Sequence, residues 1–252
     1  MASLELTKAD LTQVATVSHR GTLGLFPLGR KRRQKFVVGD DTGAVSCFEM
    51  KRGAAMTVSG FPYQTLSGEP IQNVAFNRNE EKRDRVFATQ GQSIFGVSKK
   101  GKEVFRLVSP STEEIKHLVV DEVLIYSGGD FTFQLYDNGG DAGFHMSNDR
   151  IDALAVLPRG VRQGGDGATA PDCVLACADR KLRVVRPRPG GRGADLAFEQ
   201  ELAFQVTCLA AFGLPGVGAA QLGTGGPSSS WHRAPPQLAF AGGAGAPGLL
   251  TV

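Results

Sequence analysis

Residues 36–48 read Phe-Val-Val-Gly-Asp-Asp-Thr-Gly-Ala-Val-Ser-Cys-Phe. Two runs of β-branched and aromatic residues, which favour strands, enclose a turn from Asp40 to Gly43. Aspartate and glycine are residues that tight turns favour, so the stretch predicts a β-hairpin. The same pattern of strand, turn and strand returns four times along the chain, at residues 86–95, 124–133, 174–184 and 238–250.

The spacing of these hairpins predicts the fold. Their turns begin near positions 40, 90, 128, 178 and 242, which gives steps of 50, 38, 50 and 64 residues. A four-stranded blade of a β-propeller occupies roughly 40–50 residues, and the longest step contains a visible insertion. Further strand-like runs flank the hairpins, as such a blade requires, at residues 71–76, 104–108, 115–120, 142–146, 151–157, 196–202 and 206–212.

No long helix of 3.6-residue periodicity competes with this pattern. The fold class is therefore all-β: a β-propeller of four-stranded antiparallel blades, with four full blades and part of a fifth (three strands) in a single propeller domain, residues 1–252. The hairpin strands are nearly continuous in apolar residues, which is typical of strands covered on both faces. Two segments, residues 160–171 and 213–236, are rich in Gly, Pro or Ser, and we expect both to be flexible loops.

Composition narrows the class of protein. Apolar residues make up 41% of the 252 residues, as in globular proteins, and the net charge is only +3. The densest basic run is Arg30-Lys31-Arg32-Arg33, with Lys35 close behind. We interpret it as a solvated turn between two strands; a nuclear signal or a patch for an anionic partner is the alternative. Because no concentrated basic face is evident, no nucleic-acid partner is expected.

Four cysteines are too few for a disulfide scaffold, and three of them lie in apolar strand-like runs. No apolar stretch near the first residue suits a signal peptide, and none approaches the length of a membrane span. A reducing, cytosolic compartment fits these observations best.

The triplet Asp41-Thr42-Gly43 resembles the carboxylate motif of aspartic proteases. That chemistry needs two carboxylates sharing one proton, and the chain holds no second Asp-Thr/Ser-Gly. The triplet also falls where a hairpin turn favours Asp and Gly. We therefore predict that it is a turn.

Other candidate ligands and nucleophiles also favour a structural interpretation. Cys173 and Cys177, four apart in a strand, would share one face, and no other Cys/His pair has zinc-finger spacing, so packing is predicted. Gly160 to Gly167 lacks the Lys-Ser/Thr of a phosphate loop, and no Gly-x-Ser-x-Gly elbow is present. A Ser/His/Asp site assembled in space stays open, but we expect no catalytic residue, cofactor or metal site. The histidines are scattered, at His19, His117, His145 and His232.

The first hairpin in its setting, residues 32–51, resembles the opening blade of the Bardet–Biedl syndrome 7 protein family, subunits of the BBSome. Stretches 94–102, 151–158 and 174–184 agree in order and approximate spacing. The Trp-Asp and Gly-His marks of typical WD40 repeats are absent from the blades, since Trp231 lies in a loop. The resemblance covers about residues 10–185 and fades beyond Gly213.

The resemblance implies a non-catalytic adaptor or scaffold subunit of a coat-like complex that carries ciliary membrane proteins with intraflagellar transport. The implied partners are the other BBSome subunits, notably the Bardet–Biedl syndrome 2 protein, an Arf-like small GTPase acting through the complex, intraflagellar transport particles and ciliary membrane cargo. The implied location is the cilium or flagellum, the basal body and the cytoplasm, peripheral at the ciliary membrane.

Family propellers are expected to have about seven blades, so we expect this chain to form part of a ring, from a truncated chain or a longer subunit. Leu11 to Val17 has the pattern of a strand that would complete the last blade of a closed ring. Three alternatives stay open. They are a propeller interaction module of another complex, a propeller hydrolase with a site in its central channel, and a chromatin-associated propeller that uses Arg30 to Lys35.

Overall fold

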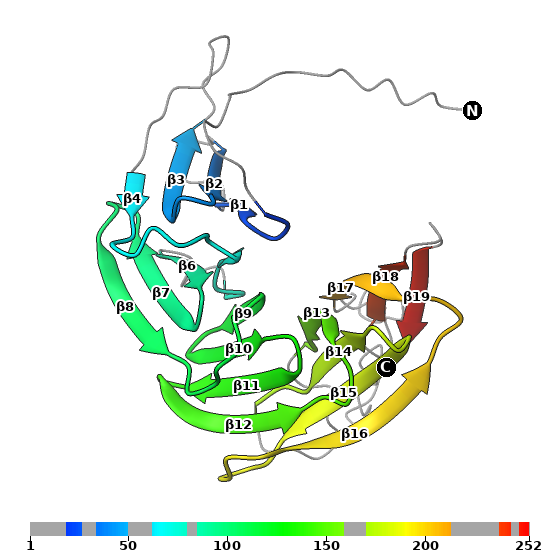
Figure 1. The fold of residues 1–252 in the computed structure, drawn as a ribbon. Helices are drawn as coiled ribbons and strands as arrows, with labels where there is room; N and C mark the ends of the chain where they lie inside the picture. The colour runs from blue at the N-terminus through cyan, green and yellow to red at the C-terminus, as the bar shows by residue number, and fades with distance from the viewer. Residues whose placement is uncertain are drawn as a thin grey trace, which may run out of the picture. The chain divides into compact units, whose positions relative to one another are not determined.

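The computed structural model describes residues 19–26, 34–49, 62–79, 85–158, 170–212, 237–242 and 247–251 (Figure 1). The chain divides into two compact units, Met1–Glu122 and Val123–Val252. The described residues form strands, turns and bends and no helix, so the all-β prediction is confirmed for this part of the chain. None of these residues belongs to a helix that could cross a membrane.

The first unit holds two complete blades. The first has the strand order β1 (Leu23–Leu25), β2 (Lys35–Gly39), β3 (Ala44–Glu49), β4 (Pro62–Gln64). The second has the order β5 (Asn73–Ala75), β6 (Arg85–Gln90), β7 (Ser93–Ser98), β8 (Glu103–Val108). The unit ends with β9 (His117–Asp121), the first strand of the third sheet.

The second unit contains the remaining strands. β10 (Leu124–Gly128), β11 (Thr132–Asp137) and β12 (Gly140–Met146) complete the third sheet. The fourth has the order β13 (Ile151–Val156), β14 (Cys173–Cys177), β15 (Lys181–Pro187), β16 (Ala194–Glu201). A three-stranded sheet follows, of β17 (Val206–Phe212), β18 (Gln237–Gly242) and β19 (Pro247–Thr251).

All five predicted hairpins are present, and the opening one pairs in register, with Phe36 opposite Phe48 and Val37 opposite Cys47. The expected count of four full blades and three further strands is thus confirmed for the described residues. The predicted strand at residues 115–120 begins at His117 instead. The one-domain prediction stays untested, and the predicted loops (apart from residues 170–171) and the strand Leu11–Val17 lie outside the described residues.

Two strands, β1 and β4, were not predicted. Each has three residues, and both end residues of each are exposed, so neither produces a run of alternating apolar residues. β4 opens with Pro62, which an edge strand tolerates because proline has no N–H to donate and one side of an edge strand has no neighbouring strand to bond. Gly24 in β1 packs against the Phe76 ring, where a Cβ would collide with the ring.

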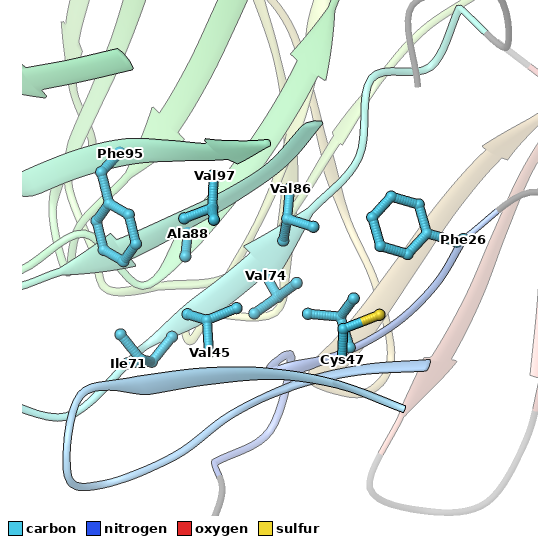
Figure 2. Close-up of a cluster of buried hydrophobic side chains, with 10 residues drawn as sticks. Phe26, Val45, Cys47, Ile71, Val74, Val86, Ala88, Phe95 and Val97 are labelled. Carbon is cyan, nitrogen blue, oxygen red and sulfur yellow. The ribbon is translucent and has the colours of Figure 1, made fainter. Parts of the chain in front are cut away.

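The core of the first unit lies between its two blades. Val37, Val45 and Cys47 of the first blade pack against Val86 and neighbouring side chains of the second (Figure 2). In the second unit, a cluster that includes Ala155, Val174, Leu182 and Val206 joins the fourth blade to β17. Every residue of β10 and β14 is buried, which is the continuous burial that the sequence predicts for the hairpin strands.

Candidate interaction surfaces

The turn between β2 and β3 is built around Asp40. Its Oδ1 accepts hydrogen bonds from the Thr42 N–H (3.0 Å), the Thr42 hydroxyl (2.8 Å) and the Ala44 N–H (2.9 Å). Gly43 adopts φ of +81°, a left-handed conformation that suits glycine. The triplet Asp41-Thr42-Gly43 is therefore a turn, as predicted. Among the described residues, no donor reaches the buried Oδ1 of Asp41.

This turn docks onto the next blade through its backbone. The Asp40 carbonyl accepts the Ile71 N–H at 2.9 Å, and the Gly43 carbonyl accepts the Thr65 N–H at 3.1 Å. The buried Gln90 side chain of β6 completes the contact by donating to the Thr65 hydroxyl at 2.8 Å. A single turn thus bonds to both ends of the connector, residues 65–72, that runs from its own blade to the next.

The same backbone bond recurs in later blades. Gly91 accepts the Ile115 N–H at 2.8 Å, and Asp130 accepts the Ile151 N–H at 2.6 Å. The donor isoleucines, including Ile71, are each at most 3% exposed. Three hairpin turns therefore hold a buried isoleucine at or just before the start of the following blade, and at the fourth the Arg180 carbonyl accepts the Leu202 N–H at 2.8 Å. These bonds give the repeat its structural basis.

Replacing Asp40 with alanine should lower the free energy of unfolding by about 2 kcal/mol, because three donors lose a charged acceptor. Asp41→Ala is the matched control and should change it by less than about 0.5 kcal/mol, since it breaks no hydrogen bond to the turn. Urea unfolding of the two variants measures the difference. A cost for Asp41→Ala as large as that for Asp40→Ala would contradict this account of the turn.

A polar cluster joins the outer strands of the first two blades. The Tyr63 hydroxyl of β4 donates to the Glu103 carboxylate of β8, and Arg106 donates to both oxygens of Glu103 at 2.7 Å. The Arg106 guanidinium also lies 5.4 Å from the centre of the Phe95 ring. The hydrogen bonds from Arg106, and to a smaller extent the one from Tyr63, hold the pKa of Glu103 below its usual range. Burial and the Glu103 carboxylate raise the pKa of Tyr63.

A second cluster lies in the fourth blade around Arg183, whose side chain is only 3% exposed. Its guanidinium makes a bidentate pair with Asp179, at 3.1 and 2.5 Å. Its Nε lies 2.8 Å from a Glu199 carboxylate oxygen without hydrogen-bond alignment, and the Cys177 thiol is 3.4 Å from the Ser147 hydroxyl. The hydrogen bond to Asp179 raises the pKa of Arg183, and the same contact lowers that of Asp179.

Three of the four cysteines pack as predicted, whereas Cys208, in the strand-like run 206–212, is exposed instead of buried. Cys173 and Cys177 are buried in β14, and Cys47 is buried in β3. Burial raises the pKa of Cys177, which keeps its thiol protonated at neutral pH. Sequence reasoning treated Cys177 as an apolar packing residue and missed its polar neighbour Arg183. The available signal was the single charge between the apolar side chains of Leu182 and Val184.

The histidines do not converge among the described residues, where no three His, Cys, Asp or Glu side chains could hold a metal ion. His145 of β12 is half-buried, and this burial lowers its pKa, while its ring bonds the Ala194 backbone. His19 is exposed, and His117 opens β9. The remaining sequence candidates lie outside the described residues, and they are Arg30–Arg33, Gly160–Gly167, Trp231 and His232.

Four-stranded antiparallel blades, joined by turn-to-strand hydrogen bonds and polar clusters within each unit, define a β-propeller protein. A family model described as the BBS7 beta-propeller matches residues 23–219. The chain belongs to the BBS7 β-propeller family, as the resemblance predicts.

Two curated relatives agree with this assignment. The BBSome complex member BBS7 of Mus musculus is 32% identical over 212 residues, covering 82% of this chain and 27% of the relative. The BBSome complex member bbs-7 of Caenorhabditis elegans is 22% identical over 182 residues, covering 71% and 24% respectively. The chain thus spans about a quarter of the length of the curated relatives it matches.

Two solved structures share the fold. BBS1N in complex with ARL6DN, soaked with mercury, gives a TM-score of 0.60 at 13% identity, covering 91% of this chain and 60% of that one. The mitotic checkpoint complex gives a TM-score of 0.59 at 11% identity, covering 86% and 59%. At such low identities these likenesses show the propeller fold alone.

Proposed function

We propose that this chain is the propeller portion of a non-catalytic scaffold subunit of the BBSome. The family match across residues 23–219, which includes all four complete blades, carries the proposal. In this role the propeller holds other subunits in a coat-like complex that carries ciliary membrane proteins with intraflagellar transport. A propeller suits scaffolding because stacked blades are rigid and present many strand edges and loops to partners.

The proposal includes the partners and the location that the family resemblance implies. The partners are the other BBSome subunits, notably the Bardet–Biedl syndrome 2 protein, an Arf-like small GTPase acting through the complex, intraflagellar transport particles and ciliary cargo proteins. The complex would act at the cilium, the basal body and the ciliary membrane. The structure of BBS1N with ARL6DN supports only the general point that a propeller of similar fold occurs in a complex.

A non-catalytic role is supported by how the candidate groups are held. The carboxylate of Asp40 caps a turn, and the carboxylates of Glu103 and Asp179 are engaged by arginines. Groups held this way stabilise blades. The lowered pKa values of Glu103 and Asp179 keep both carboxylates ionised, unlike a general acid poised near neutral pH.

Affinity purification of the tagged chain from ciliated cells should recover other BBSome subunits. The matched control is the Gly43→Val variant, in which the added side chain collides with the Glu69 backbone and disturbs the packing of the first blade on the second. We expect subunit recovery with the unaltered chain and much weaker recovery with the variant. Purification of the folded chain without any BBSome subunit would contradict the proposal.

A further inference from the structure

The turn between β7 and β8, from Ser98 to Lys102, presents three lysines on a rigid frame. The Ser98 N–H donates to the Lys102 carbonyl at 2.8 Å, and the Gly101 N–H donates to the Ser98 carbonyl at 2.9 Å. The Ser98 hydroxyl accepts the Lys102 N–H at 3.2 Å, and Gly101 adopts φ of +77°. The turn conformation is therefore held by its own backbone, and Lys99, Lys100 and Lys102 all lie exposed. We call Ser98–Lys102 the lysine turn.

The lysine turn carries three charges that no side chain in the described part of the chain neutralises. Among the residues that the structure describes, no carboxylate makes an ion pair with Lys99, Lys100 or Lys102. In the second unit, by contrast, six lysine or arginine side chains make an ion pair with a carboxylate. They are Arg150, Arg180, Lys181, Arg183, Arg186 and Arg188.

The lysine turn lies at the end of the first unit where β2 and β6 begin. β2 begins at this end with Lys35 and β6 begins there with Arg85, because both strands run away from it towards their hairpin turns. The opposite end carries carboxylates, on the hairpin turn and on the connectors that bond to it. These are Asp40, Asp41, Glu69, Glu113 and Glu114.

Hydrogen bonds confirm that the acidic ends of the blades coincide. Gln90, beside the β6–β7 turn, donates to the Thr65 hydroxyl and the Glu69 carbonyl, and the Gly91 carbonyl accepts the Ile115 N–H. These bonds bring the turns of both blades together with the connector that holds Glu113 and Glu114. Among the described residues of the first unit, the end with the lysine turn holds more cations than carboxylates, although Glu49, Glu103, Asp121 and Glu122 also lie there. The opposite end holds more carboxylates than cations, with Arg20 and Lys116 as its described cations.

We propose that the lysine turn docks an acidic segment of a partner protein. The three ammonium groups of this turn, which have no ion pair with any described residue, attract carboxylates without requiring a fixed approach angle, because an ammonium group acts as a point charge. The turn carries no apolar side chain to enter a bilayer, whereas surface-binding membrane segments combine cations with large apolar residues. These observations favour a protein partner over a lipid surface. Because the interaction is exposed, it would act over about 8 Å at physiological salt and weaken at higher salt.

The test measures binding of a labelled poly-glutamate peptide to the full chain by fluorescence anisotropy, at low and high salt. Lys100→Glu should weaken binding about fivefold, as expected for reversing one exposed charge at an interface. Arg192→Glu is the matched control, because Arg192 is an exposed cation of the second unit with no ion pair among the described residues. Its effect should stay below about twofold.

Equal loss in the two variants, or no binding of the peptide at low salt, would overturn the proposal. Vesicles of phosphatidylcholine with and without phosphatidylserine form the second arm. Binding to the anionic vesicles that requires Lys100, without peptide binding, would also overturn it and identify a lipid surface instead. The urea midpoint of each variant shows that it folds. Recovery of BBSome subunits is a separate readout, so this proposal and the scaffold role can fail independently.

Discussion

Replacing Arg183 with methionine is expected to lower the free energy of unfolding by about 3 kcal/mol. The guanidinium is 3% exposed and holds Asp179 in a bidentate pair, so its loss leaves that carboxylate without its main partner. Asp179 and Glu199 keep side-chain exposures of 25% and 31%, and water can therefore hydrate them. This partial exposure keeps the expected cost at the lower end of the range for broken buried ion pairs.

The matched control for Arg183 is Arg188→Met, in the same strand–loop region. The side chains of the Arg188–Asp195 pair are 59% and 54% exposed, so the control should unfold close to the unaltered chain. Guanidinium chloride would screen these charges, so urea unfolding at constant low salt is the appropriate measurement. Similar costs for the two variants would contradict the special role of the buried pair.

The cost of Arg183→Met should also depend on pH. Arg183 lowers the pKa of Asp179 in the folded chain, whereas the unfolded value is about 3.9. A lowered folded pKa contributes stability above the unfolded value, and that contribution disappears as pH falls through the folded pKa. The difference between the unaltered chain and the variant should therefore narrow below about pH 4. A constant difference down to acid pH would show that the pair acts through packing alone.

Replacing Gly43 with alanine should lower the free energy of unfolding by at least about 3 kcal/mol, from left-handed strain and overpacking together. The backbone at Gly43 has φ of +81°, which a side chain disfavours. A Cβ added there would approach the Glu69 carbonyl oxygen to 2.8 Å and would collide with the Thr65 hydroxyl. Neither neighbour yields easily, because one is backbone and the other is a buried β-branched side chain.

Gly190→Ala separates these two effects. Gly190 shares the left-handed backbone, with φ of +65°, but nothing lies within 4 Å of an added Cβ. This control should therefore cost only the backbone strain, about 1–2 kcal/mol. Equal urea midpoints for the two variants would mean that the turn of the first blade is not tightly packed against the second.

Short-range patterns in the sequence predict most of this fold. Residues 36–48 alternate strand, turn and strand locally, so the hairpin depends on no distant contact. The strands β1 and β4 were not predicted because each has only three residues, the outer two exposed, and so shows no periodic pattern of apolar residues. Each forms only by pairing with a longer strand. Ile115 was assigned to a strand because it is apolar; instead it precedes β9 and bonds the Gly91 carbonyl.

The candidate sites also divide into those that local residue preferences predict and those that form only in the folded chain. The turn character of Asp41-Thr42-Gly43 and the burial of Cys173 followed from local residue preferences. Arg183 of β15 lies against Glu199 of the neighbouring strand β16, and Tyr63 meets Glu103 between two blades, 40 residues apart in the chain. Contacts of this kind depend on strand register and blade stacking, which no local pattern encodes.

By itself, the sequence determined the all-β class and the five hairpins, because hydrophobic alternation and turn chemistry act between near neighbours. It also indicated the family, through the resemblance carried by residues 32–51 and three later stretches. Only the tertiary structure decided which polar groups meet. It placed Asp40 against the start of the next blade, buried Arg183 beside Cys177 and left the lysine turn without an ion pair among the described residues. The physical reason is that a charge is satisfied or left free by whatever the folded chain brings within a few ångströms of it.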